Sequence, residues 1–296
     1  GTPLSYAKRI DTASITSTRV LPISDGSTFI CGENQSVNPR GGGIARLTST
    51  GTVSWVNELS SGGGGNTTGG RAESLAVDPS GNLYVRHVNY TYNGSSYWQY
   101  IAKYNGSTGA NLWSIQYFYQ SFRGMGLGVD TSGNSYFGNA VSSVFYLMKA
   151  DTNGTVTLTR SVPNAEWFSA GVYGGQGTVS TLYTPGGAVI ASLFQDGGGR
   201  LVKFTTNLDI TWAMQAVNPS GNCRFEGDVA SDSSDNYYVS GYGNEGGYTY
   251  GIVLKFNSAG TLQWQRRIKS SGWPSDQISM QVGSIRVGNT SDIIYL

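Results

Sequence analysis

The chain has 296 residues, of which only 12% are charged, and its formal net charge is +1. Binding to nucleic acid or to an anionic membrane needs clustered Lys and Arg, so this near-neutral composition argues against both functions. No apolar run approaches the roughly 20 residues that a membrane-spanning helix needs, so insertion into a membrane is not expected.

A hairpin pattern recurs five times along the chain. Each copy has two runs in which apolar and polar residues alternate, joined by a turn of Asn, Ser, Thr or Gly residues. Alternation with a period of two on both sides of such a turn predicts an antiparallel β-hairpin. The copies occupy residues 43–59, 100–116, 146–160, 200–215 and 251–268.

Two positions are shared by the hairpins: a basic residue near the end of the first run and a tryptophan in the second. We expect each indole to pack between neighbouring sheets, where its N–H needs a partner. We expect the basic side chain to lay its aliphatic stem across apolar surface. The third copy has Leu158 in place of the tryptophan. The residues are Arg46, Lys103, Lys149, Lys203 and Lys255, with Trp55, Trp113, Trp212 and Trp264.

A shorter pattern lies between the hairpins and consists of two apolar runs around a tight turn. It is clearest at residues 75–85 and 127–137, and residues 228–239 repeat it with Asp235 in the place of glycine. We expect this turn to need a positive φ, which glycine supplies most easily. The turn positions recur every 49 to 55 residues, at Gly26, Gly81, Gly133, Gly186, Asp235 and Asn289.

A repeat of about fifty residues with four short antiparallel strands predicts an all-β fold, the β-propeller, in which each repeat is one blade. We expect a single propeller domain over residues 1–296, with six blades; seven or more blades in a longer chain are the alternative. Five complete blades are expected at residues 15–60, 72–118, 124–162, 177–217 and 225–269.

The two ends of the chain supply the expected sixth blade. Residues 1–11 match the last strand of a blade, and residues 278–296 match the first two strands. Pairing the two ends would close the ring and leave no free sheet edge. One strand would still be missing, so either this blade has three strands or the chain continues beyond Leu296.

The repeats resemble those of known propellers. Residues 105–113 (NGSTGANLW) resemble the tryptophan-docking repeat of quinoprotein-dehydrogenase-like propellers, and IAKYN followed by VDxSGNxY is similar to the bacterial SBBP-type repeat. The extended form LKFNSAGTLQWQRRI, residues 254–268, resembles predicted structural proteins of marine bacteriophages, especially cyanophages. The resemblance implies a propeller on a tail or fibre component, but propellers host many unrelated activities.

Residues for catalysis or for metal binding do not form a recognisable set. His87 is the single histidine and is expected to be an ordinary residue at the rim of a blade, and no Gly-x-Ser-x-Gly elbow is present. The turns of the type Asp130-Thr131-Ser132-Gly133-Asn134 resemble calcium loops but lack the bidentate acid of a tight site. We therefore expect no enzyme, no cofactor and no metal site.

The connections opposite the short turns vary in length and are rich in Tyr and Trp among Asn, Ser, Gly and Gln. Such residues suit stacking on sugar rings or contact with a protein; the alternative is that they only cover the rims of the blades. The connections expected to be loops include residues 87–99, 117–123 and 241–250. The candidate binding residues are Tyr90, Tyr92, Tyr97, Trp98, Tyr117, Tyr119, Arg123, Trp167, Tyr173, Tyr242, Tyr248 and Trp273.

These patterns lead us to expect a non-catalytic structural or adhesion module of a virion or extracellular assembly. Its partner would be another subunit of the particle or a host-surface polysaccharide, with assembly into homo-oligomers through a larger protein. The alternatives are a glycan-cleaving or quinone-type oxidative propeller enzyme, and a secreted bacterial surface propeller. The location would be extracellular or on the virion surface.

Overall fold

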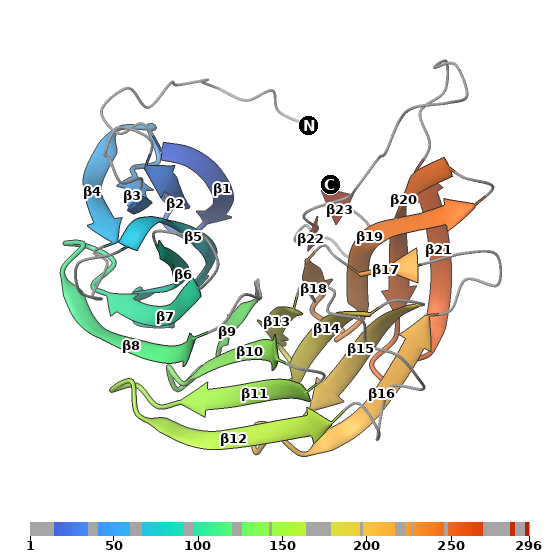
Figure 1. The fold of residues 1–296 in the computed structure, drawn as a ribbon. Coiled ribbons are helices and arrows are strands. Elements are labelled where there is room, and N and C mark those ends of the chain that lie inside the picture. Colours follow the sequence, from blue (N-terminus) through green and yellow to red (C-terminus); the bar gives the residue numbers. More distant parts are fainter. Residues whose placement is uncertain are drawn as a thin grey trace. The chain divides into compact units, whose positions relative to one another are not determined.

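The computed structural model describes residues 15–34, 41–59, 67–91, 97–119, 126–141, 144–163, 179–195, 198–216, 223–225, 228–245, 248–268, 285–287 and 294–295. Within these ranges the secondary structure consists of β-strands joined by turns (Figure 1). No helix of the described residues is long and apolar enough to cross a membrane. The chain divides into two compact units, of which the first contains Gly1–Ser121 with the turns Thr131–Gly133 and Asp151–Thr155.

The first unit contains two antiparallel sheets of four strands, which we call blades one and two. In both, the strands pair in chain order, β1-β2-β3-β4 and β5-β6-β7-β8. The strands of blade one are β1 (Ile15–Pro22), β2 (Thr28–Asn34), β3 (Gly41–Leu47) and β4 (Val53–Leu59). Those of blade two are β5 (Thr67–Val77), β6 (Leu83–Thr91), β7 (Tyr97–Tyr104) and β8 (Asn111–Tyr119).

The second unit contains blades three, four and five, whose strands also pair in chain order. Blade five differs in that its first strand is split into two segments, β17 and β18, which both pair with β19. Blade three is β9 (Leu127–Val129), β10 (Ser135–Val141), β11 (Val144–Ala150) and β12 (Val156–Pro163), and blade four is β13 (Val179–Tyr183), β14 (Val189–Gln195), β15 (Gly198–Phe204) and β16 (Ile210–Ala216). Blade five is β17 (Cys223–Arg224), β18 (Val229–Ser231), β19 (Tyr237–Glu245), β20 (Tyr248–Phe256) and β21 (Leu262–Ile268).

The prediction of four-stranded antiparallel blades is confirmed, but the predicted number of blades is wrong. The residues that the structure describes form five blades, not six, seven or more. Near the C-terminus, β22 (Arg286–Val287) and β23 (Ile294–Tyr295) form a two-stranded sheet of their own. Two strands of two residues make too few ladder hydrogen bonds to form a blade. The predicted strand at residues 1–11 lies outside the described residues.

Strand alternation sends successive residues to different neighbouring sheets, because side chains along a strand point to opposite faces. On β14 of blade four, Val189 and Ala191 join the apolar cluster with blade three, which includes Leu147. Ile190 points the other way and joins the cluster with blade five, which includes Val239. The central strands are therefore buried on both faces, and this explains their nearly continuous runs of Val, Ile, Leu and Ala.

The predicted role of the tryptophans is confirmed for Trp55, Trp113 and Trp212. Trp55 of blade one donates its indole N–H to the carbonyl oxygen of Gly106 in the turn of blade two, at 3.0 Å. In the second unit, Trp212 of blade four donates to Ser258 of blade five at 3.1 Å. A basic residue reaches the same carbonyl in both places, because Arg46 and Lys203 also donate to Gly106 and Ser258. Each pair of side chains thus joins its own blade to the next one.

Blade three has Leu158 in place of the tryptophan, and the turn of the following blade has a leucine in place of the usual glycine. Turns that receive an indole have a glycine with positive φ beneath the ring, and an added Cβ at Gly109 would lie 2.9 Å from the ring of Trp55. At the equivalent turn position, blade four carries Leu208 with φ of 63°. Leu158 itself is 38% exposed. Among blades two to five, the glycine is therefore present where an indole lies against the turn and absent where Leu158 replaces the indole.

The tight turns of the shorter repeat are held by their own side chains. In the turn that begins at Asp78, the carboxylate accepts hydrogen bonds from the backbone N–H and the side-chain amide of Asn82, at 2.8 and 2.9 Å. Burial opposes ionisation of Asp78, but these bonds and the nearby Lys103 ammonium outweigh it and lower its pKa. The turn of blade four has its positive φ at Gly187, so the predicted position, Gly186, is wrong by one residue.

Candidate functional site

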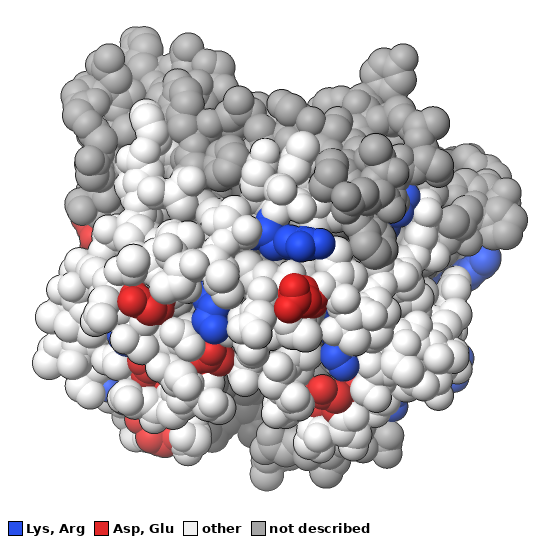
Figure 2. Space-filling model, turned by 90° about the horizontal axis from the view of Figure 1, so that it is seen from below, with Lys and Arg blue, Asp and Glu red and all other residues white. Residues whose placement is uncertain are grey.

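Charged side chains are sparse on the face shown in Figure 2, where the described Lys and Arg lie among Asp and Glu. In the first unit, the buried Lys103 ammonium lies 3.2 Å from the Asp78 carboxylate. No group of three or more His, Cys, Asp or Glu side chains suited to a metal ion occurs in the part of the chain that the structure describes. The aromatic residues singled out in the sequence are therefore the next candidates for a binding site.

Four of the predicted aromatic residues lie at neighbouring positions in blade two. Tyr90 pairs with Tyr97, and Trp98 pairs with Tyr119. We call this part of the sheet the blade-two end, defined as residues 86–91 of β6, 97–100 of β7 and 117–119 of β8. Their placement in strands corrects the prediction that residues 87–99 form a loop. These segments are rich in Tyr, Trp, Val and Thr, which favour strands, and both β6 and β7 therefore extend into the region expected to be a loop.

The other predicted binding residues do not join this group. Tyr242 was expected in a loop but lies in β19 of blade five, where it pairs with Gly251 and is only 8% exposed. Of Tyr90, Tyr97, Tyr119 and Tyr248 the structure describes the backbone, and Trp98 is half-buried. Tyr92, Arg123, Trp167, Tyr173 and Trp273 lie outside the described residues.

Tyr117, also expected in a loop, belongs to β8 and takes part in a buried polar network. Its hydroxyl accepts a hydrogen bond from Nε of Arg86 at 2.6 Å and donates one to Oε1 of Gln99 at 2.9 Å. Nη2 of Arg86 also donates to Oε1 of Gln99. Both Arg86 and Gln99 are completely buried. The three residues come from three successive strands and form a closed triangle of hydrogen bonds, which we call the blade-two triad.

The triad replaces small or apolar residues of the other blades. The strand registers place Arg86 opposite Ile101, two residues beyond the pair made by Lys103 and Tyr84. The same offset in the other blades leads to residues that are all small or apolar. For Arg86 the equivalents are Cys31, Gly138, Ser192 and Ser240, and for Gln99 they are Gly42, Phe145, Gly199 and Gly251. Counted along the chain, four residues after the tryptophan position, the equivalents of Tyr117 are Leu59, Val162, Ala216 and Ile268; a register shift in β8 places Phe118, not Tyr117, opposite Gln99.

Beside the triad lies Glu73, a carboxylate that sequence reasoning missed. Oε1 of Glu73 lies 2.9 Å from Nη2 of Arg71, while its Oε2 is buried without a hydrogen-bond partner. Nη1 of Arg86 is likewise buried without a partner. Glu73 is the extra residue of a β-bulge between Ala72 and Ser74, and bulges re-aim a side chain. Nδ1 of His87 and Nδ2 of Asn89, in the same part of β6, are also buried without a hydrogen-bond partner.

Proton affinities at the site are shifted by burial. Burial raises the pKa of Tyr117 to about 12; the charge of Glu73 adds to this effect, while Arg86 opposes it. His87 was expected at a rim, but it is only 3% exposed and its ring stacks on Tyr100 at 4.9 Å between centroids. Burial lowers the pKa of His87 to about 4, against a smaller opposing effect of Asn89. At neutral pH both side chains are therefore uncharged.

The signal that could have revealed this site lies in the repeats themselves. When the five repeats are aligned on their shared basic residue, Arg86, Gln99 and Tyr117 stand out as departures from the pattern. Tyr117 lies in the register shift at Gln99/Tyr100 between β7 and β8, which the sequence pattern does not reveal.

Comparison with known proteins bears on the fold. No protein-family model matches the chain, and no curated protein matches its sequence significantly. Among solved structures, a protein from Lactobacillus plantarum has a TM-score of 0.55 at 12% identity and covers 83% of this chain and 69% of its own. An ulvan lyase, described as a new family of polysaccharide lyase bound to -[GlcA(1-4)Rha3S]-, has a TM-score of 0.52 at 12% identity, with coverages of 86% and 72%.

A quinoprotein alcohol dehydrogenase-like protein from Bacteroides thetaiotaomicron also matches, with a TM-score of 0.43 at 10% identity and coverages of 84% and 65%. At such identities a likeness shows the fold alone. The chain is a β-propeller with four-stranded antiparallel blades. The propeller repeat predicted from the sequence is thereby supported in general, and the link to phage tails or fibres is not.

Proposed function

We propose that this propeller is a non-catalytic binding module that holds a polysaccharide at the blade-two end. One observation carries the proposal: the blade-two triad puts Arg86, Gln99 and Tyr117 where the other blades have small or apolar residues. Burying the Arg86 cation carries a desolvation penalty that the other blades avoid. Such a local departure from the rules of stable folding is expected at functional sites. The triad adjoins the four aromatic positions of the same sheet end.

The chemistry of this sheet end suits a sugar chain. Tyr and Trp rings have an apolar face, on which the C–H groups of a sugar ring can stack, and a polar edge for its hydroxyls. Trp98 pairs with Asn89 on one side and with Tyr119 on the other, so its backbone is held in place before binding. A preformed surface loses less conformational entropy when a ligand binds. The triad anchors this part of β7, because Gln99 follows Trp98 directly and its side chain points to the opposite face of the sheet.

Proton transfer is not favoured at this site, and this supports a binding role over the enzyme alternatives. A general acid or base works best with a pKa near the working pH. The pKa of His87 is lowered to about 4 and that of Tyr117 is raised to about 12, so both lie far from neutrality. The polysaccharide lyase bound to a sugar chain offers an analogy for a propeller that holds a saccharide, at the level of fold only.

For its setting, we propose the surface of a virion or of another extracellular assembly. The support is the resemblance of residues 254–268 to structural proteins of marine phages. The low net charge of +1 supports a partner other than nucleic acid or an anionic membrane.

The test is a panel of polysaccharides presented to the purified chain, with Trp98→Ala as the site variant. We expect binding to at least one polysaccharide and a loss of at least about tenfold in affinity in the variant, the scale of one buried aromatic contact. Tyr146→Ala is the matched control, because Tyr146 is a half-buried aromatic residue on β11, the strand equivalent to β7.

Tyr146→Ala should bind like the unaltered chain. If no polysaccharide binds, the proposal fails, and the partner-subunit alternative can be examined by copurification. An equal loss in both variants would also refute the assignment to the blade-two end.

A further inference from the structure

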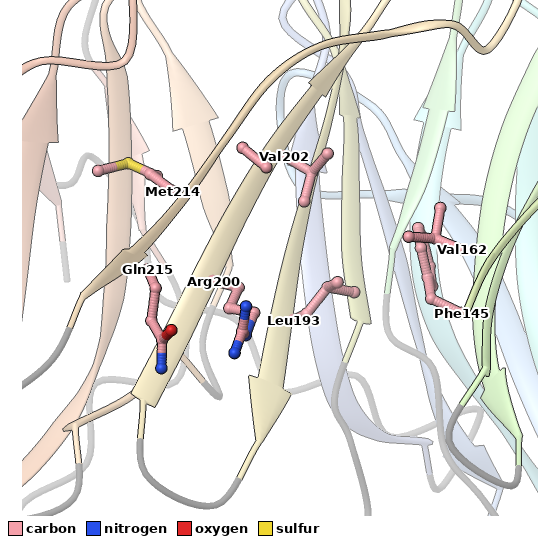
Figure 3. Close-up of a pocket in the computed structure, with 8 residues that line it drawn as sticks. Phe145, Val162, Leu193, Arg200, Val202, Met214 and Gln215 are labelled. Carbon is pink, nitrogen blue, oxygen red and sulfur yellow. The ribbon is translucent and has the colours of Figure 1, made fainter. Parts of the chain in front are cut away.

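A cavity lies in the second unit, between blades three and four. It has a volume of about 160 Å³ and is lined mainly by apolar side chains (Figure 3). A well-packed propeller core has few voids larger than a water molecule, so a hollow of this size is a distinct feature. The lining residues are Phe145, Val162, Leu193, Arg200, Val202, Ala213, Met214 and Gln215.

Two polar side chains stand at one side of this otherwise apolar space. Arg200 of β15 and Gln215 of β16 are directly paired across the strands, and Leu193 of β14 pairs with Arg200 from the other side. Figure 3 shows the guanidinium of Arg200 and the amide of Gln215 extending in the same direction. Arg200 is 8% exposed, whereas Gln215 is exposed and marks the open side of the cavity.

Arg200 is a second departure from the repeat. Three residues before the shared basic residue, the other blades carry Gly43, Tyr100, Tyr146 and Ile252, none of which is charged. Burial lowers the pKa of Arg200. A carboxylate next to a guanidinium forms charge-assisted hydrogen bonds with it, and Arg200 stands at the side of the cavity where such a group could lie.

We propose that this cavity binds a small organic acid with one carboxylate and one apolar body of about the size of a benzene ring. Arg200 receives the carboxylate, Gln215 donates from the open side, and Phe145, Val162 and Leu193 enclose the apolar body. The volume fits this class, since an apolar cavity of about 150 Å³ in another protein binds benzene. An apolar pocket with a few converging polar groups is the usual form of a small-molecule site.

The experiment uses benzoate as the probe and benzyl alcohol as a neutral ligand of similar shape, each titrated into the full chain with binding read by ligand-observed NMR. We expect benzoate to bind at least about tenfold more tightly than benzyl alcohol, as one charge-assisted contact provides. Failure of benzoate to bind, or equal binding of the two compounds, would overturn the proposal without any variant.

Variants separate the roles of charge and space. Arg200→Met should weaken benzoate by at least about tenfold and leave benzyl alcohol within about twofold, while Ala213→Leu, which fills the cavity, should weaken both. Arg160→Met, at an exposed arginine of β12 outside the lining, is the control and should change neither. Benzoate binding that survives both Arg200→Met and Ala213→Leu would contradict the site. Melting temperatures of all variants confirm that each one is folded.

Discussion

Tyr117 links the two other members of the blade-two triad, since its hydroxyl both accepts from Arg86 and donates to Gln99. Tyr117→Phe leaves Nε of a buried guanidinium without this acceptor. We expect the free energy of unfolding to fall by about 1–3 kcal/mol, the cost of a buried polar group left unpaired. Urea denaturation measures the change.

Tyr100→Phe is the matched control for this prediction. Its hydroxyl donates a long hydrogen bond to Gln116 at 3.2 Å, and Gln116 is exposed. The expected loss is therefore below about 1 kcal/mol. If Tyr100→Phe costs as much as Tyr117→Phe, the triad has no special share in stability.

His87 gives the propeller a stability that depends on pH in a window of its own, because it is the single histidine. Burial lowers its pKa in the folded state from 6.5 to about 4, so the unfolded chain takes up a proton first as the pH falls. The stabilisation is present above pH 6.5 and is lost toward pH 4. Between pH 7 and pH 5 we expect the free energy of unfolding to fall by about 2 kcal/mol.

A His87→Phe variant keeps a stacked ring beside Tyr100 but cannot take up a proton. Denaturation curves at pH 7, 6 and 5 should show no such fall for the variant. An unchanged slope would mean that other groups cause it and that His87 is accessible to protonation in the folded state.

At the scale of elements, the contact between an indole and the glycine of the next turn ties blades together. Gly109 has φ of 75° and lies against the ring of Trp55, whereas Gly81 has φ of 78° with nothing within 4 Å of an added Cβ. Gly81→Ala should therefore cost about 1 kcal/mol, from backbone strain alone. Gly109→Ala should cost more, about 2–4 kcal/mol, because the ring must also move.

A double-mutant cycle isolates the contact itself. Blade three and the turn of blade four show that Leu158 and Leu208 can occupy the two positions together. We therefore expect Trp55→Leu and Gly109→Ala to be non-additive, with a coupling of about 1 kcal/mol in thermal or chemical denaturation. Strict additivity of the two substitutions would show that the indole and the glycine do not interact.

The hairpins and their shared Trp and basic positions could be predicted because the rules that form them are local: alternation of period two, turn residues, and one repeated partner. The aromatic connections could not be predicted as well. Residues 87–91 and 97–99 flank the sequence Asn93-Gly94-Ser95-Ser96, whose composition indicates a loop. Cross-strand pairing nevertheless extends β6 through residues 87–91 and β7 through residues 97–99. Pairing depends on the partner strand, which a single segment does not reveal.

At the scale of the whole molecule, the prediction of six blades depended on the two chain ends, whereas the five complete blades were predicted from the repeat. The match of residues 1–11 and 278–296 to blade strands predicted a sixth blade, and five are found. Similarity of a short segment to a strand does not ensure that it pairs, because β22 and β23 contribute only two residues each.

The blade-two triad also belongs to this scale, since its meaning lies in the comparison of all five blades. Within β6 alone, Arg86 does not attract notice. Among the five equivalent positions of the blades, it is the one that carries a charged residue. The sequence alone therefore contained the candidate residues, while the hydrogen bonds among three strands required the structure.

Amide hydrogen exchange of the full chain, with and without a polysaccharide selected from the panel, tests the central proposal most directly. A ligand at the blade-two end should slow exchange at residues 86–91 and 97–100, and leave the equivalent residues 138–141 and 144–146 of blade three unchanged. Protection of blade three to the same extent, or protection that spares blade two, would contradict it.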